Sequence, residues 1–136
     1  MGEARNALEM ILDTDVLIDV LRGYPEAVTF LTQSSTGKEG LGISVVTLSE
    51  ILSGIRDKEG PSVESLLRIL TPLPVTEPIA RTAGQYRRQY FRSHGLLTPD
   101  ALIAATTRHH GGLLVTLNRK HYPMKDIEIR VPYSKA

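Results

Sequence analysis

The chain has no cysteine and no tryptophan, and aromatic residues make up only 5% of its 136 positions. The absence of cysteine excludes a disulfide framework and any metal site built from thiolates, and it fits the reducing cytoplasm, where we expect the protein to act. No apolar run approaches the ~20 residues that a membrane helix needs, and the first residues do not read as a secretory signal. We therefore expect no membrane association, and a core built mainly from Leu, Ile, Val and Ala.

An excess of charge of either sign is also missing. Lys and Arg number 16 against 15 Asp and Glu, which gives a formal net charge of +1. A global basic field therefore does not point to a nucleic-acid partner. Local basic clusters do occur, at Arg87, Arg88 and Arg92 and at Arg119 and Lys120. Solvated surface is the ordinary interpretation of such arginines and lysines, and contacts to RNA phosphates are the functional one.

Short apolar segments alternate with amphipathic or apolar stretches along the whole chain. The pattern predicts strands over residues 10–13, 41–46, 72–75, 113–116 and 127–131. It predicts helices over residues 15–22, 25–34, 47–58, 61–70, 78–93 and 99–110. The first strands do not alternate between apolar and polar residues, which is typical of buried parallel strands. With residues 1–8 as a loose leader, a loop over 34–40 and no repeat or linker, we expect a single α/β domain over 1–136.

Acidic and amide side chains follow the predicted strands at the points where they end. Asp13 and Asp15 end the first strand, Glu50 lies in the first turn of the helix after the second, and Asn118 follows the fourth. Asp100 opens the apolar helix that precedes the fourth strand. Because ligand sites in parallel α/β sheets form at the carboxyl ends of the strands, we expect these residues to gather at one edge.

Each of these residues also has an ordinary structural interpretation. Asp13, Asp15 and Asp100 are good helix caps. On its predicted helix, Glu50 points away from the apolar stripe and could be a solvated surface acid, and Asn118 could be a simple turn residue. Clustered carboxylates repel one another, however, and are costly to bury. A divalent cation removes that cost, and hard oxygen ligands suit Mg²⁺ or Mn²⁺.

The motifs, taken together and in order, are more specific than any one of them. The segments "ILDTDVLID", "ISVVTLSEILSGI" and "TPDALIAATTRHHGGLLVTLNRKHY" resemble the PIN-domain ribonucleases. The resemblance is greatest to the VapC toxins of VapBC toxin–antitoxin modules and covers about residues 10–132. It implies a Rossmann-like, three-layer α/β/α sandwich with a mainly parallel central sheet.

The resemblance also implies an activity and a site. Members of the family cut RNA by hydrolysis in an acidic pocket that binds Mg²⁺ or Mn²⁺. Asp13, Glu50 and Asp100 match the acidic residues of the family motif, and we expect them to be catalytic and to bind the metal. Asn118 is expected as a further metal ligand. Secondary contacts are expected from Thr14, Asp15 and Thr116.

One region departs from the family pattern. Many relatives carry a further acid where this chain has His121. The resemblance implies an RNA substrate, which in the family includes tRNA, a homodimer, and a VapB-like antitoxin that blocks the pocket. For RNA contacts outside the pocket we expect Arg87, Arg88, Arg119 and Lys120.

Two other functions are weighed against a nuclease. The "DTDVL" segment superficially resembles the start of haloacid-dehalogenase phosphatases, but Leu17 stands where those enzymes need Thr, and the chain has little room for a cap domain. The departure at His121 leaves one alternative open, a non-catalytic PIN-like module that binds RNA or protein.

Overall fold

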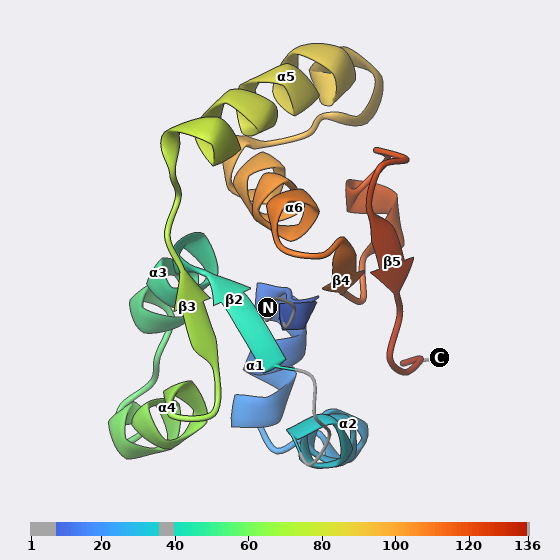
Figure 1. Cartoon of the computed structure of the whole chain (residues 1–136). Coiled ribbons are helices and arrows are strands. Elements are labelled where there is room, and N and C mark those ends of the chain that lie inside the picture. Colours follow the sequence, from blue (N-terminus) through green and yellow to red (C-terminus); the bar gives the residue numbers. More distant parts are fainter. Residues whose placement is uncertain (1–7, 36–39, 136) are drawn as a thin grey trace, which may run out of the picture.

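The computed structural model of the chain describes residues 8–35 and 40–135 (Figure 1). Most of the predicted leader and part of the predicted loop over 34–40 lie outside these described residues. In the described part, no helix is both long enough and apolar enough to cross a membrane.

A five-stranded sheet forms the centre of the molecule, in the order β3-β2-β1-β4-β5. All four neighbouring pairs are parallel. The strands are β1 (Leu8–Leu12), β2 (Gly40–Ser44), β3 (Thr71–Leu73), β4 (Leu113–Val115) and β5 (Glu128–Arg130). The chain builds outward from β1 to β3 and then returns to add β4 and β5 on the other side of β1. The predicted parallel α/β class is confirmed, and β5 forms one edge of the sheet.

Helices connect the strands and cover the two faces of the sheet (Figure 1). They are α1 (Thr14–Leu21), α2 (Pro25–Ser35), α3 (Val45–Ser53), α4 (Gly60–Leu67), α5 (Glu77–His94) and α6 (Thr98–His109), followed by a short 3₁₀ helix, η2 (Arg119–His121). Parallel neighbours require such crossover connections, because a hairpin turn can join only antiparallel strands.

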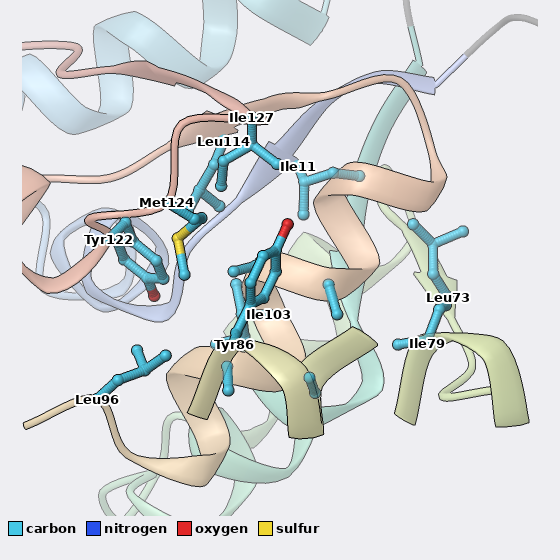
Figure 2. Close-up of a cluster of buried hydrophobic side chains, with 14 residues drawn as sticks. Ile11, Leu73, Ile79, Tyr86, Leu96, Ile103, Leu114, Tyr122, Met124 and Ile127 are labelled. Carbon is cyan, nitrogen blue, oxygen red and sulfur yellow. The ribbon is translucent and has the colours of Figure 1, made fainter. Parts of the chain in front are cut away.

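The core divides into two clusters, one on each face of the sheet. Ile11 and Leu114 pack with α5, α6 and the segment around Met124, in the cluster that Figure 2 shows. Leu12 and Val115, their neighbours in the chain, pack on the other face with residues of α1 to α4. Adjacent strand residues point to opposite faces, so both faces of these strands are buried. This arrangement is the predicted three-layer sandwich, and it explains why the apolar runs do not alternate.

The start of α3 differs from the prediction. Residues 41–46 were expected to be a strand, with the next helix beginning at residue 47. Instead β2 ends at Ser44, whose hydroxyl accepts a hydrogen bond from the Val46 amide at 3.0 Å. The β-branched residues after Ser44 therefore form the first helical turn, because the cap outweighs their strand preference. As a result, Glu50 lies in the second turn of α3 and not in the first.

The ends of two helices also differ. α3 stops at Ser53 and not near Lys58, since Gly54 caps it and donates its amide hydrogen to the Ile51 carbonyl. α4 stops at Leu67 and not near Leu70. Helix ends are weakly specified by sequence, because a single capping contact decides them.

Candidate functional site

The candidate site lies at the carboxyl ends of β1 and β4, the topological switch point of the sheet. β1 has β2 on one side and β4 on the other, so the crossovers that leave β1 and β4 diverge at their carboxyl ends. The register pairs Leu12 with Val115, which places the residues after both strands side by side. Such a switch point leaves a crevice that connecting helices do not fill.

Asp13 occupies this crevice and is held by three donors. Its Oδ1 accepts a hydrogen bond from the Thr14 amide at 2.8 Å, which makes it the cap of α1. Its Oδ2 accepts hydrogen bonds from the hydroxyls of Thr116, at 2.8 Å, and Tyr122, at 2.9 Å. The side chain is only 7% exposed. The capping interpretation and the site interpretation of Asp13 are therefore compatible, since different oxygens serve each.

Asp15 connects the start of α1 to the segment after β4. Its Oδ2 accepts hydrogen bonds from the Leu117 amide, at 3.0 Å, and from Nδ2 of Asn118, at 2.9 Å. Burial first, and the charge of Asp13 second, raise the pKa of Asp15 to about 6. Asn118 thus points its amide nitrogen at Asp15, which leaves its amide oxygen as the atom that could face an ion.

Asp100 approaches Asp13 from α6. Leu97 is the N-cap of α6, so Asp100 does not cap the helix but sits in its first turn. The Tyr122 hydroxyl lies 3.4 Å from Oδ1 of Asp100 while it donates to Asp13, and this one oxygen links the two acids. Burial, followed by the charges of Asp13 and Glu50, raises the pKa of Asp100, and His121, 3.7 Å away, opposes this effect.

Glu50 reaches the same crevice from α3. It accepts a hydrogen bond from the Thr14 hydroxyl at 2.5 Å, and that hydroxyl also lies 3.2 Å from the hydroxyl of Thr47. The helical-wheel interpretation of Glu50 as a solvated surface acid is wrong, because its side chain is partly buried against α1. A wheel describes one helix alone and cannot show which neighbour lies opposite its polar face.

The cluster has a large excess of negative charge. Among the described residues, no lysine or arginine forms an ion pair with Asp13, Asp15, Glu50 or Asp100, and only His121 approaches them with a basic group. Burial and this shared charge also raise the pKa of Tyr122, so the phenol keeps its proton and remains a donor. A bound cation would offset the repulsion between carboxylates that lie this close together.

The donor set fits a hard divalent cation, although the side chains do not enclose one as they stand. In the described part of the chain, no group of three or more His, Asp or Glu residues is arranged to hold an ion. The hydroxyls of Thr14, Thr116 and Tyr122 instead bind the carboxylate oxygens. Clustered carboxylate oxygens are nevertheless the ligands that Mg²⁺ and Mn²⁺ prefer.

A cavity of about 600 Å³ adjoins the cluster on the side of Asp15 and Asn118. Its far wall is the C-terminal segment, where Tyr133 and Lys135 both bind Asp19 of α1, at 2.8 Å. Asp15 therefore has open space beside it, large enough for a small ligand.

The four residues predicted to contact RNA lie outside the acid cluster. Arg87 and Arg88 lie on α5, and Arg119 and Lys120 lie on η2 next to His121. Arg119 donates a hydrogen bond to the Ile129 carbonyl at 3.4 Å, and Lys120 is exposed.

Tyr122 is the site residue that the sequence did not single out. It is the last residue of the third segment that resembles the family, and its ring belongs to the core cluster (Figure 2). The one feature of the sequence that could have indicated its role is that this residue is Tyr and not Phe. A phenol that is 3% exposed needs a hydrogen-bond partner, and the acids of the nearest strand ends supply one.

Comparisons with known proteins agree with this geometry. The family model described as "PIN domain" matches residues 10–127. Ribonuclease VapC10 of Mycobacterium tuberculosis is 41% identical over 92% of this chain and 93% of its own length. Ribonuclease VapC19 of the same organism is 35% identical over 90% of this chain and 98% of its own length.

Solved structures resemble the chain as well. One chain of a toxin–antitoxin complex from Klebsiella pneumoniae is 23% identical, with a TM-score of 0.74 over 92% of this chain and 98% of that one. At this identity the likeness shows the fold alone.

Proposed function

Because the chain belongs to the PIN-domain family, we propose that it is an endoribonuclease toxin that depends on Mg²⁺ or Mn²⁺ and is inhibited by a cognate antitoxin. The observation that carries this proposal is the junction of Asp13 and Asp100 through the Tyr122 hydroxyl, at the switch point of a parallel sheet. The relatives named ribonucleases extend over nearly the whole chain, which supports RNA as the substrate.

Asp13, Asp100 and Glu50 are the proposed metal ligands, with the Asn118 amide oxygen as a further one. When bound, the ion supplies positive charge that polarises a phosphodiester and lowers the pKa of a water molecule. Asp13 retains a lone pair on Oδ1 for this purpose, because Thr116 and Tyr122 bind its Oδ2 while the Thr14 amide takes only one site on Oδ1.

The remaining residues of the site orient these ligands. Thr116 and Tyr122 fix the carboxylate plane of Asp13, and Thr14 fixes Glu50. Glu50 can then accept the proton of the attacking water, whose oxygen forms the new bond to phosphorus as the bond to a ribose oxygen breaks. Asp15 is a positioning residue in this scheme, because it ties Asn118 and Leu117 to α1.

An acidic pocket with no lysine or arginine partner among the described residues suits an inhibitor that brings a basic side chain. Toxin–antitoxin complexes are among the structural neighbours, which supports an antitoxin as that partner. A homodimer stays a prediction, to be checked by the mass of the purified protein in solution.

The direct test is cleavage of total cellular RNA by the purified chain, with Mg²⁺, with Mn²⁺ and with EDTA. We expect discrete fragments that require metal, and no fragments from Asp13→Asn or Asp100→Asn. Asp57→Asn is the matched control, since it makes the same chemical change at an exposed acid outside the cluster. Cleavage that survives both site substitutions would reject the proposal.

His121 supports one alternative, a module that binds RNA or protein without cutting it. Its ring lies 3.7 Å from Asp100, where a cationic imidazole would offset negative charge that otherwise attracts a metal. RNA binding by a folded, antitoxin-free protein that cuts nothing in any metal would favour this alternative.

A further inference from the structure

One face of α5 carries basic groups without acidic neighbours. Between Glu77 and Asp100 the sequence has no Asp or Glu, yet it contains Arg81, Arg87, Arg88, Arg92 and His94. Arg81 pairs with Glu77 at 2.8 Å. The other three arginines lie within the last two turns of the helix, where each adds positive charge that no acid of α5 balances.

These three arginines differ from others in the described part of the chain. Arg22 pairs with Glu59 at 2.9 Å and Arg108 pairs with Asp126 at 3.2 Å. Arg88 and Arg92, by contrast, form no hydrogen bond or ion pair with any described residue. The guanidinium donors of Arg88 and Arg92 are therefore available to an anion from outside.

Arg87 is held in place by two contacts. Its Nε donates a hydrogen bond to the Leu96 carbonyl at 3.0 Å, and its guanidinium lies 4.6 Å from the centre of the Phe91 ring. Phe91 is 48% exposed, which is unusual for so large an apolar side chain. The Arg87 guanidinium and the Phe91 ring therefore form a cation–π stack on the surface of α5.

The stack borders a small hollow. Arg87, Arg88, Phe91 and Arg92 line a space of about 310 Å³, at the lower end of the range for small-ligand sites. The hollow therefore combines an aromatic face with three guanidinium groups and no acid in its lining.

The hollow lies on the helix that leads into α6, and α6 carries Asp100 of the acidic site. α5 ends at His94, Gly95 turns the chain in the left-handed conformation, and α6 begins at Thr98. α5 and α6 pack as neighbours (Figure 1), and Asp100 lies in the first turn of α6. Arg88 is six residues before the end of α5, or about 9 Å along the helix axis.

We propose that Arg87, Arg88, Phe91 and Arg92 form a platform for unpaired nucleotides of the RNA next to the bond that is cut. A base stacks on the Phe91–Arg87 pair, and Arg88 and Arg92 bind the flanking phosphates. Aromatic and guanidinium faces bind single-stranded bases in this way, whereas the faces of paired bases are covered within a duplex. The proposal rests on the proposed function, because it assigns contacts to the same RNA substrate.

Charge favours RNA over the other occupants of such a surface. A second copy of the chain packed on this face by a two-fold axis would bring the same arginines against one another. A polyanion instead pairs with all of them at once and releases counterions.

The test is binding of a fluorescent single-stranded RNA 12-mer in EDTA, followed by anisotropy, so that no cleavage is needed. We expect Phe91→Leu to weaken binding about 10-fold and Phe91→Tyr to retain it. Arg88→Gln and Arg92→Gln should each lower affinity and reduce the slope of log affinity against log salt by about 0.7. Arg68→Gln, the same charge change at an exposed arginine at the end of α4, is the matched control and should bind like the wild type.

Several results would overturn the platform, three of them from the variants and the RNA probes. These are equal affinity of all variants, equal weakening for the same RNA annealed to its complement, and a change in particle mass by light scattering in Phe91→Leu, which would make this face an interface between copies. Polyglutamate that binds more tightly than RNA would assign the face to an acidic protein segment and would also reject the proposal.

The experiments distinguish a failure of the proposed platform from a failure of the proposed nuclease function. A chain that cuts no RNA, but binds it through Phe91, loses the proposed function and keeps the platform. A chain that cuts RNA with an unchanged KM in the Phe91 and Arg88 variants keeps the function and loses the platform.

Discussion

The Tyr122 hydroxyl offers the sharpest test of how the acidic site is built. It donates to Asp13 at 2.9 Å and lies 3.4 Å from Asp100, inside a pocket where the ring is 3% exposed. A buried hydrogen bond to a charged group contributes about 1.5–3 kcal/mol. Asp13 keeps its bonds from Thr116 and the Thr14 amide, so we expect Tyr122→Phe to lower the free energy of unfolding by about 2 kcal/mol.

Urea unfolding followed by far-ultraviolet circular dichroism, in EDTA, measures this loss. The corresponding fall in Tm for a domain of this size is roughly 5–10 °C. Tyr86→Phe is the comparison, since it removes the hydroxyl of a similarly buried tyrosine whose acceptor, Asp126, is 43% exposed. We expect that variant to lose about 1 kcal/mol or less. Equal losses in the two variants, or no loss in Tyr122→Phe, would refute the idea that the phenol holds the acids together.

Three further predictions concern other parts of the site and the fold. The pKa of Asp15 is raised to about 6, so the folded protein binds this proton more tightly than the unfolded chain does between about pH 4 and pH 6. The contribution of Asp15 to the free energy of unfolding therefore falls as the pH rises through that window. As the pH rises from 4 to 7, the unfolding free energy of Asp15→Asn should therefore increase relative to that of the wild type, by up to about 3 kcal/mol, in metal-free urea titrations. A difference between the two proteins that does not change with pH would contradict the raised pKa of Asp15. Thr14→Val removes the donor to Glu50 and should lower the rate of RNA cleavage about 10-fold, with recovery in Thr14→Ser. Ser44→Ala removes the cap of α3 and should cost about 1 kcal/mol of unfolding free energy, whereas a stable variant would mean that the cap does not set the start of α3.

The fold could be predicted because its signals are local and repeated. Ile11 and Leu12, like Leu114 and Val115, are adjacent apolar residues that pack on opposite faces of the sheet. Only a strand covered on both faces needs such a run, and helices between the strands supply the cover. The boundaries of α3 and α4 were not predictable to the same degree, because each depends on one cap or turn and not on a repeated pattern.

The site was predictable at the level of strand ends, and less so at the level of contacts. The carboxyl ends of β1 and β4 bring Asp13, Asp15 and Asn118 together, as the parallel sheet implies. The resemblance implied secondary contacts from Thr14 and Thr116, but not which acid each hydroxyl binds. Thr116 and Asp13, for example, are 103 residues apart and meet only through the β1–β4 register. Glu50 shows the same limit, because its partner Thr14 lies on another helix.

The nature of the cleaved ends tests the central claim most directly. Attack by water on the phosphodiester does not use the ribose 2′-hydroxyl, so fragments from the wild-type protein should carry linear phosphate and hydroxyl ends by mass spectrometry. The same products should disappear in Asp13→Asn and persist in Asp57→Asn. Fragments that end in 2′,3′-cyclic phosphate, and that form equally well with Asp13→Asn, would contradict the account, because they would show attack by the ribose itself without the carboxylate cluster.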